Sequence, residues 1–435
     1  MGGRAGNHLQ RTGPPLIIRG GTIVTARGVE TGDIAIAGGQ ITGVGRNLPD
    51  RGEEIDASGL HVFPGGIDSH VHFNEPGRTG WEDISHGSAA LAAGGYTSFI
   101  DMPLNSLPVT TDVAAFDLKL EAMKRSSTVD FGLWGGLVPG NLDQLEPLVE
   151  RGVIGFKAFM CSSGIDEFPA TDLTTLREGM KGIAALGSML LVHAEDPSQL
   201  LEPRGRGALD FIRSRPPEAE WSAIAQAIEL AEATGCRLHV VHVSTSAGAR
   251  LVREAQERGV DVSGETCPHY LLYVEEDLER LGGVGKCAPP FRTSADRDAM
   301  WDMPMVVSDH SPSPLDLKQG DDFFKLWGGI SGCQSTRQLL LGQGRLDESQ
   351  VAATTATNIA RRFGLAHKGD IAPGFDADLW IVDLSQKDVV RREDLLYRNP
   401  FSAHEGQPIR GRTVRTLVRG QDSDRGRFIR AGERS

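Results

Sequence analysis

The sequence predicts an α/β fold, in which a (β/α)8 TIM-type barrel is joined to a small, discontinuous β-sandwich formed by both chain ends. Short apolar, β-branched runs alternate with helix-like segments through the middle of the chain. Val- and Ile-rich runs with glycine pairs recur at both ends, as in small antiparallel sheets. Glycine makes up 54 of the 435 residues, which suits a fold with many tight connections.

Eight runs are predicted as barrel strands, and most of them are followed by a helix-like segment. The strands are expected at 61–71, 96–101, 130–136, 153–160, 188–193, 237–243, 260–265 and 304–309, with helices that include 81–94, 111–125, 172–186 and 217–234. Periodicity alone also permits an open, doubly wound sheet. Neither GxGxxG nor GxxxxGK[ST] follows an early strand, which disfavours a nucleotide-binding sheet.

Three segments define the expected domains. Residues 1–63 form the N-terminal part of the β-sandwich, 64–365 the barrel, and 366–435 the C-terminal part of the sandwich. The segment 295–304 is too short for an average helix with its connections. The seventh barrel helix is therefore expected to be truncated.

Composition excludes several classes of protein. With 45 Lys+Arg against 58 Asp+Glu, the net charge of −13 disfavours a nucleic-acid partner. The apolar runs are strand-sized and fall short of the ~18 residues of a membrane span. The start of the chain has no apolar signal core, and the five cysteines form no CxxC pair, so we expect a cytoplasmic protein with free thiols.

Side chains that bind metals follow the predicted strands, and a barrel places its chemistry at these carboxyl ends. His70 and His72 are two residues apart, so they share one face of the first strand. Any one such residue is more often a core or surface side chain, and a buried lysine is more often ion-paired or extended to solvent. Their recurrence at five strand ends favours a site; the remaining members are Lys157, His193, His242 and Asp309.

Imidazole and carboxylate together suit zinc and related divalent ions. Four histidines and one aspartate are more than a single open zinc site uses, so two ions are expected. His242 lies at the end of the sixth strand and is the better candidate there. His239 is an odd number of residues away and should face the other side of the strand.

These motifs resemble the cyclic amidohydrolases of the amidohydrolase superfamily, and among them the allantoinase group. The resemblance runs from Pro64–His72 to Gly369–Gly374. It implies a pair of divalent ions, zinc first, with cobalt, manganese or iron as alternatives. His70 and His72 would bind the more buried ion, His193 and His242 the second. The resemblance also implies that Lys157 bridges the ions as N6-carboxylysine, formed with carbon dioxide, and that Asp309 touches the first ion and serves as the catalytic base.

The resemblance also bears on the substrate. Dihydroorotases carry an arginine two residues after the HxH motif, where Asn74 stands here. The implied reaction is hydrolysis of (S)-allantoin to allantoate in purine catabolism, by a hydroxide held between the ions. Asn105, Ser311 and main-chain groups near Cys287 would contact the substrate, although Asn105 is equally well interpreted as an ordinary turn residue.

Two alternatives stay open. One is a hydantoinase or dihydropyrimidinase with the same chemistry. The other is a catalytically impaired or non-enzymatic relative, because 295–304, 341–345 and 421–425 are shorter than is usual in the family. The resemblance alone suggests a homotetramer.

Overall fold

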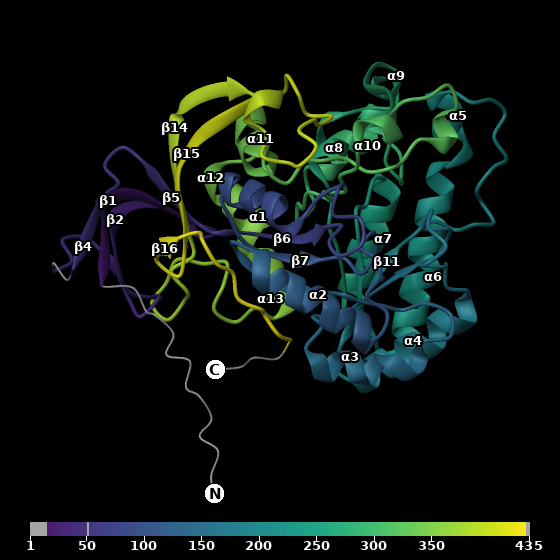
Figure 1. The fold of residues 1–435 in the computed structure, drawn as a ribbon, viewed down its shortest axis with the longest axis horizontal. Coiled ribbons are helices and arrows are strands. Elements are labelled where there is room, and N and C mark those ends of the chain that lie inside the picture. Colours follow the sequence, from purple (N-terminus) through teal and green to yellow (C-terminus); the bar gives the residue numbers. More distant parts are fainter. Residues whose placement is uncertain (1–14, 50–51, 432–435) are drawn as a thin grey trace, which may run out of the picture.

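The computed structural model describes residues 15–49 and 52–431 (Figure 1). The first 14 residues, which belong to the predicted segment 1–63, lie outside them. The middle of the chain forms two runs of parallel strands. One run contains β6 (Gly66–Val71), β7 (Tyr96–Asp101) and β8 (Asp130–Leu133); the other contains β9 (Gly135–Gly136), β10 (Phe156–Phe159), β11 (Met189–His193), β12 (Arg237–Val240) and β13 (Val262–Gly264).

The two runs close into a barrel. Trp134 separates β8 from β9, so the predicted third strand is present as two pieces. On the other side, isolated parallel bridges from Thr266 to Val306 and from Val71 to His310 take the place of a regular eighth strand. The chain has the α/β fold with a TIM-type barrel that the sequence predicts.

Helices surround the barrel, and aspartates fix where several of them begin. Asp83, Asp112 and Asp172 each accept a hydrogen bond from a main-chain N–H three residues later. The helices are α1 (Ile84–Ala93), α2 (Val113–Ser126), α3 (Leu145–Arg151), α4 (Leu173–Ala185), α5 (Ala208–Ser214), α6 (Pro217–Thr234), α7 (Ser246–Glu257), α8 (Pro268–Leu272), α9 (Asp277–Leu281), α10 (Ser294–Met300), α11 (Thr336–Gln343), α12 (Glu348–Ala352) and α13 (Asn358–Phe363).

The seventh barrel helix, α10, has seven residues, as short as the sequence predicted. The wall beside it is nevertheless complete. Thr266 donates its N–H to Met305 O at 3.0 Å, and Val307 donates to Thr266 O at 3.0 Å. On the other side, Val306 donates to Thr354 O at 3.1 Å. The segment that leads to Asp309 is therefore hydrogen-bonded along both edges.

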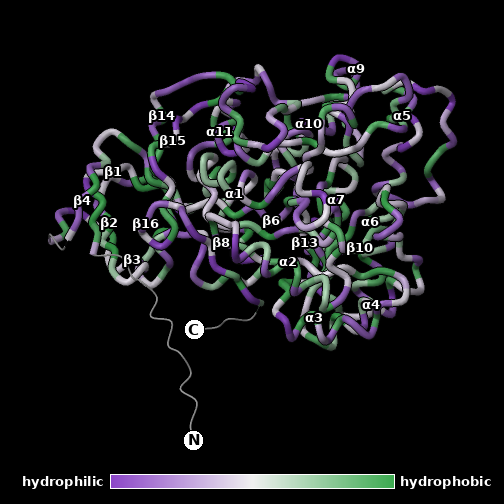
Figure 2. The backbone as a smooth tube through the Cα atoms, in the orientation of Figure 1, coloured by the Kyte–Doolittle hydropathy of each residue, from purple (hydrophilic) through white to green (hydrophobic). Residues whose placement is uncertain are grey.

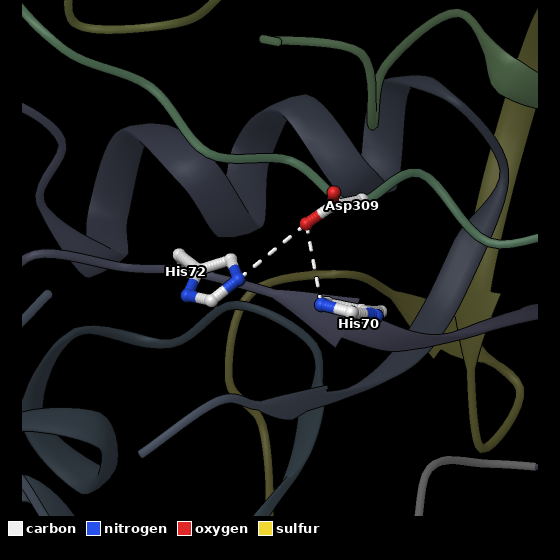
Figure 3. Close-up of side chains that lie close together, drawn as sticks. All are labelled: His70, His72 and Asp309. Atoms are coloured by element: carbon white, nitrogen blue, oxygen red, sulfur yellow. Dashed lines mark ion pairs between the residues drawn. The ribbon is translucent and has the colours of Figure 1, made fainter. Parts of the chain in front are cut away.

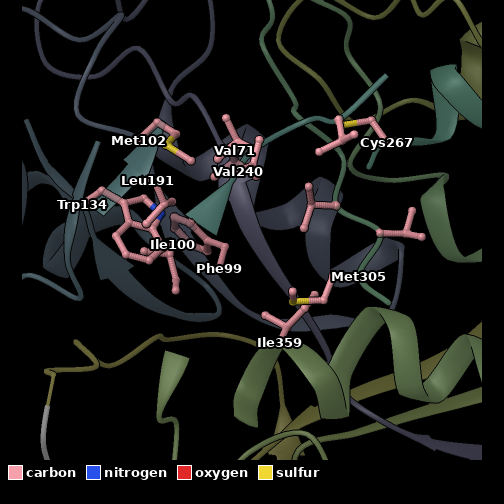
Figure 4. Packing of buried hydrophobic residues seen from close by; sticks show 14 of the residues in the cluster. Val71, Phe99, Ile100, Met102, Trp134, Leu191, Val240, Cys267, Met305 and Ile359 are labelled. Atoms are coloured by element: carbon pink, nitrogen blue, oxygen red, sulfur yellow. The ribbon is translucent and has the colours of Figure 1, made fainter. Parts of the chain in front are cut away.

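The barrel strands carry many buried apolar side chains. Val71, Phe99, Leu191 and Val240 come from four strands and belong with Trp134 to one apolar cluster, each at most 1% exposed (Figure 4). Figure 2 shows hydrophobic stretches in the strands and hydrophilic residues in many outer loops. Burial of these side chains is the main favourable term in folding.

Both chain ends join one eight-stranded sheet, coloured purple and yellow in Figure 1. The junction is the antiparallel pair of β5 (His61–Pro64) and β14 (Leu379–Val389). The other members are β1 (Leu16–Thr25), β2 (Gly28–Ala37), β3 (Gln40–Gly45), β4 (Glu53–Asp56), β15 (Pro408–Val418) and β16 (Gln421–Asp422). Strands from both ends of the sheet contribute to one apolar cluster of their own. The domain limits at 63/64 and 365/366 stay a prediction.

A buried charge cluster connects this sheet to the barrel. Lys368 Nζ lies 2.8 Å from Asp130 at the start of β8, 3.2 Å from Asp376 and 2.7 Å from Asp378. The three carboxylates hold the pKa of Lys368 above its ordinary value, although burial opposes this. The lysine is therefore a cation shared between the two parts of the fold.

Candidate active site

Two imidazoles and one carboxylate converge where β6 ends (Figure 3). His70 Nε2 lies 3.2 Å from Asp309 Oδ1, and His72 Nε2 lies 3.4 Å from the same oxygen. The His70 ring is 1% exposed and the His72 ring 7%. Period-two geometry places both rings on one side of the strand, as the sequence predicts. The three side chains form a group that could hold a metal ion.

A second pair of imidazoles lies at the ends of β11 and β12. His193 Nδ1 is 3.0 Å from His242 Nε2. His193 Nε2 lies 2.7 Å from Glu195 Oε2, so the ring donates a proton there and presents an unprotonated Nδ1 to His242. The rings of His70 and His242 have centroids 5.4 Å apart, which brings the two pairs into one site.

Lys157 lies on β10 and is 0% exposed, with its Nζ 4.8 Å from the centroid of the Phe159 ring. Among the described residues its Nζ has no hydrogen-bond partner. Burial lowers its pKa to about 7, although the charges of Asp309 and Glu265 act in the opposite direction. A buried amine without partners is costly unless something else binds it.

Two glutamates support the histidines, and the sequence analysis did not identify them. Glu265 Oε1 accepts from His70 Nδ1 at 2.7 Å, and its other oxygen lies 3.1 Å from His239 Nε2. Glu195 bonds His193 and forms an ion pair with Arg215. Burial opposes ionisation of Glu195, but the Arg215 charge lowers its pKa to about 2. Carboxylates in this position fix the tautomer of a ligating histidine.

The sequence contained a signal for both acids. Glu195 stands two residues after His193, and Glu265 immediately follows β13. Both acids thus stand at the carboxyl ends of barrel strands, where the chemistry of a barrel is expected.

The expected orientation of His239 is wrong. Its ring lies in the barrel interior, where it contacts Glu265 and where Nδ1 is 2.7 Å from Ser263 Oγ. The reason is that β12 ends at Val240, and His242 has a φ of 39°, so strict alternation does not extend from His239 to His242.

Unusual backbone conformations cluster here. Among the described residues, five non-glycine residues have positive φ, and three of them are Asn105 (80°), His242 (39°) and Asp309 (46°). Such conformations cost of order 1–3 kcal/mol each and persist where the surroundings enforce them. All three residues line one cavity.

This cavity has a volume of about 490 Å³ and opens above the two pairs of histidines. The predicted substrate residues Asn105, Cys287 and Ser311 line it, and Asn105 Nδ2 donates to Ser311 Oγ at 3.4 Å. Arg215 and Lys286 contribute positive charge to its wall. The predicted metal residues also line it, except for Lys157.

The amidohydrolase family model matches residues 61–420. The chain belongs to the amidohydrolase family. Its sequence is 50% identical to an allantoinase of Rubrobacter xylanophilus, over 95% of this chain and 97% of the relative. It is 48% identical to an allantoinase of Solibacter usitatus, over 93% and 92%.

Solved structures with the same fold include two related enzymes. An L-hydantoinase (dihydropyrimidinase) from Arthrobacter aurescens superposes with a TM-score of 0.92 and 30% identity, over 95% of this chain and 99% of that one. A dihydropyrimidinase from Brevibacillus agri superposes with a TM-score of 0.88 and 28% identity, over 97% and 100%. Within the described residues, no helix has both the length and the apolar character needed to cross a membrane.

Proposed function

We propose that this amidohydrolase opens the hydantoin ring of (S)-allantoin with water to give allantoate, a step of purine catabolism. The observation that carries the substrate assignment is the similarity to allantoinases along nearly the whole chain, at up to 50% identity among the relatives named. The cavity of about 490 Å³ accommodates a small neutral ring of this kind.

The site supports two divalent ions, zinc first, with cobalt, manganese or iron as alternatives. His70, His72 and Asp309 would hold one ion, and His193 with His242 the other. The donor set fits, because each pair presents ring nitrogens toward a common point. Lys157 fits as a carbamate formed with carbon dioxide, because its Nζ is buried and unpartnered among the described residues. Two such ions supply an activated water molecule and positive charge for the substrate carbonyl oxygen.

The chain's own residues then move the proton and position the ring. Asp309 accepts the proton of the attacking water and delivers it to the ring nitrogen that leaves. Glu265 and Glu195 keep His70 and His193 in the tautomers that face the site. Asn105, Ser311 and main-chain groups near Cys287 orient the substrate through hydrogen bonds.

The decisive experiment measures allantoin turnover and metal content on the same preparation. We expect turnover with about two ions per chain, as a two-metal site requires. A panel of allantoin, hydantoin, dihydrouracil and dihydroorotate separates the proposal from the hydantoinase alternative, a related activity on the same fold. Faster turnover of hydantoin than of allantoin would favour that alternative. A protein that binds no metal and opens none of the four rings would instead be a non-enzymatic relative.

Lys157 has its own test. The Lys157→Ala variant should lose metal and activity, and short carboxylic acids should restore part of both by replacing the carbamate. The control is Lys181→Ala, at an exposed position of α4. Full metal content in Lys157→Ala without added acid would contradict the bridging role. By family analogy, we further propose that the enzyme is a cytoplasmic homotetramer, which sedimentation equilibrium of the purified protein tests.

A further inference from the structure

A second group of ligating side chains shares Asp309 with the site described above. Cys267, His269 and Asp309 each offer a ligand atom, and these atoms lie within 4.8 Å of one another. All three residues are buried. Neither Cys267 nor His269 has a part in the proposed reaction.

His269 points to a ligand. Its side chain is 0% exposed, and neither ring nitrogen has a hydrogen-bond partner among the described residues. Its contacts are with rings: Tyr270 at 4.3 Å and Phe291 at 6.2 Å between centroids. A buried polar group without a partner destabilises the fold. An ion held between His269, Cys267 and Asp309 would remove that cost.

We propose that Cys267, His269 and Asp309 form a separate site for a soft divalent ion such as Cd²⁺ or excess Zn²⁺, and that an ion bound there inhibits the enzyme by withdrawing Asp309. Thiolate and imidazole ligands select ions of this class. On binding, the Cys267 thiol gives its proton to solvent. The resulting thiolate and the Asp309 carboxylate together balance the two positive charges of the ion, so the buried complex is neutral.

The geometry allows the site to form without rebuilding the fold. Bonds of about 2.0–2.3 Å place ligand atoms about 3.5 Å apart around a tetrahedral ion, so the side chains must close by no more than about 1.3 Å. Asp309 Oδ1 faces His70 and His72, whereas its other oxygen points away from them (Figure 3). Asp309 also lines the cavity, which gives the ion a route to the group.

The test adds Cd²⁺ to the holoenzyme and follows three readouts: total metal per chain, the ultraviolet charge-transfer band of cadmium thiolate, and turnover of the ring substrate. We expect a third ion per chain, a thiolate band, and at least a tenfold loss of turnover. All three changes should have their midpoint at the same Cd²⁺ concentration. Cys267→Ser should abolish the band, and His269→Gln should raise the midpoint at least tenfold. Cys236→Ser is the matched control, because Cys236 is 2% exposed and lies outside the metal-binding groups of the described residues.

Several results would overturn the proposal. One is that Cd²⁺ displaces the resident ions, so that the total metal per chain stays constant. The others are absence of the thiolate band from the wild-type protein and persistence of that band in Cys267→Ser. A third ion bound without loss of turnover would overturn the inhibitory role. The wild-type metal count and band decide the matter even if a variant does not fold. Both readouts are independent of the allantoinase proposal, which fails separately if the holoenzyme does not open allantoin.

Discussion

Replacing Glu265 with glutamine tests how the barrel prepares His70 for a metal ion. Glu265 is 0% exposed and accepts from His70 Nδ1 at 2.7 Å, while its second oxygen lies 3.1 Å from His239 Nε2 and 3.2 Å from Ser69 Oγ. Because His70 donates from Nδ1, its Nε2 keeps the lone pair that faces Asp309 at 3.2 Å. Glutamine has nearly the same shape but only one acceptor oxygen and no charge.

The size of the effect follows from these contacts. If the glutamine oxygen stays with His70, its amide group meets His239 and Ser69, so the buried Ser69 hydroxyl loses its acceptor, which costs about 1–3 kcal/mol. Removal of the partner of a ligating histidine lowers metal affinity by about 10–100-fold. A tenfold change in affinity corresponds to about 1.4 kcal/mol, so the loss of metal affinity agrees with the energy of the lost hydrogen bond.

Equilibrium dialysis against buffered metal measures the change. We expect Glu265→Gln to bind one ion about 10–100-fold more weakly, and the ion at His193 and His242 with nearly unchanged affinity. The control is Asp130→Asn, a buried acid at the start of β8 that bonds Lys368 and Arg419 and should affect stability alone. If both ions bind Glu265→Gln as tightly as the wild type, Glu265 does not support the metal site.

Three further substitutions have defined outcomes. Asp309→Asn should lower kcat by about 10²–10⁴-fold, as expected for a lost general base, and near-normal turnover by the folded variant would exclude that role. Lys368→Met removes the cation that buried Asp130 and Asp378 share with half-buried Asp376, so urea unfolding should show a loss of about 3–5 kcal/mol, whereas exposed Lys387→Met should show little change. Gly329→Ala should raise KM for allantoin, because at φ 130° the new Cβ would lie 2.5 Å from Ser311 O; an unchanged KM would argue that Ser311 does not contact substrate.

Much of the fold could be predicted from the sequence because its signals are local. Alternating strand and helix patterns located the barrel, and helix-capping aspartates such as Asp83 and Asp112 mark where helices begin. The eighth strand was harder, because it forms through isolated bridges such as Thr266 to Val306 rather than a continuous ladder. The sequence of one strand does not show how many residues of a neighbouring strand will form hydrogen bonds with it.

The candidate site was predictable for a related reason. Parallel strands of a barrel end on one face, so residues that end different strands meet there. The sequence analysis did not identify the acidic residues that support the histidines. Glu265 lies next to His70 only because β13 and β6 flank the segment that leads to Asp309, which brings together residues 195 positions apart. His239 also faces inward, because strand alternation stops at Val240 and does not extend to His242.

The position of Asp309 shows how this packing serves the site. Its φ of 46° departs from a strand, so the chain must be fixed on both sides. On one side, Ser308 donates its N–H to Asp68 Oδ1 at 3.2 Å; on the other, His310 O accepts from His72 N at 2.8 Å. Asp68 Oδ1 also accepts from His70 N at 3.2 Å. One buried carboxylate thus binds both the HxH strand and the segment that carries Asp309, and the second contact uses the HxH backbone itself. The motif therefore supplies two imidazoles and also holds the strained backbone that aims Asp309 at them.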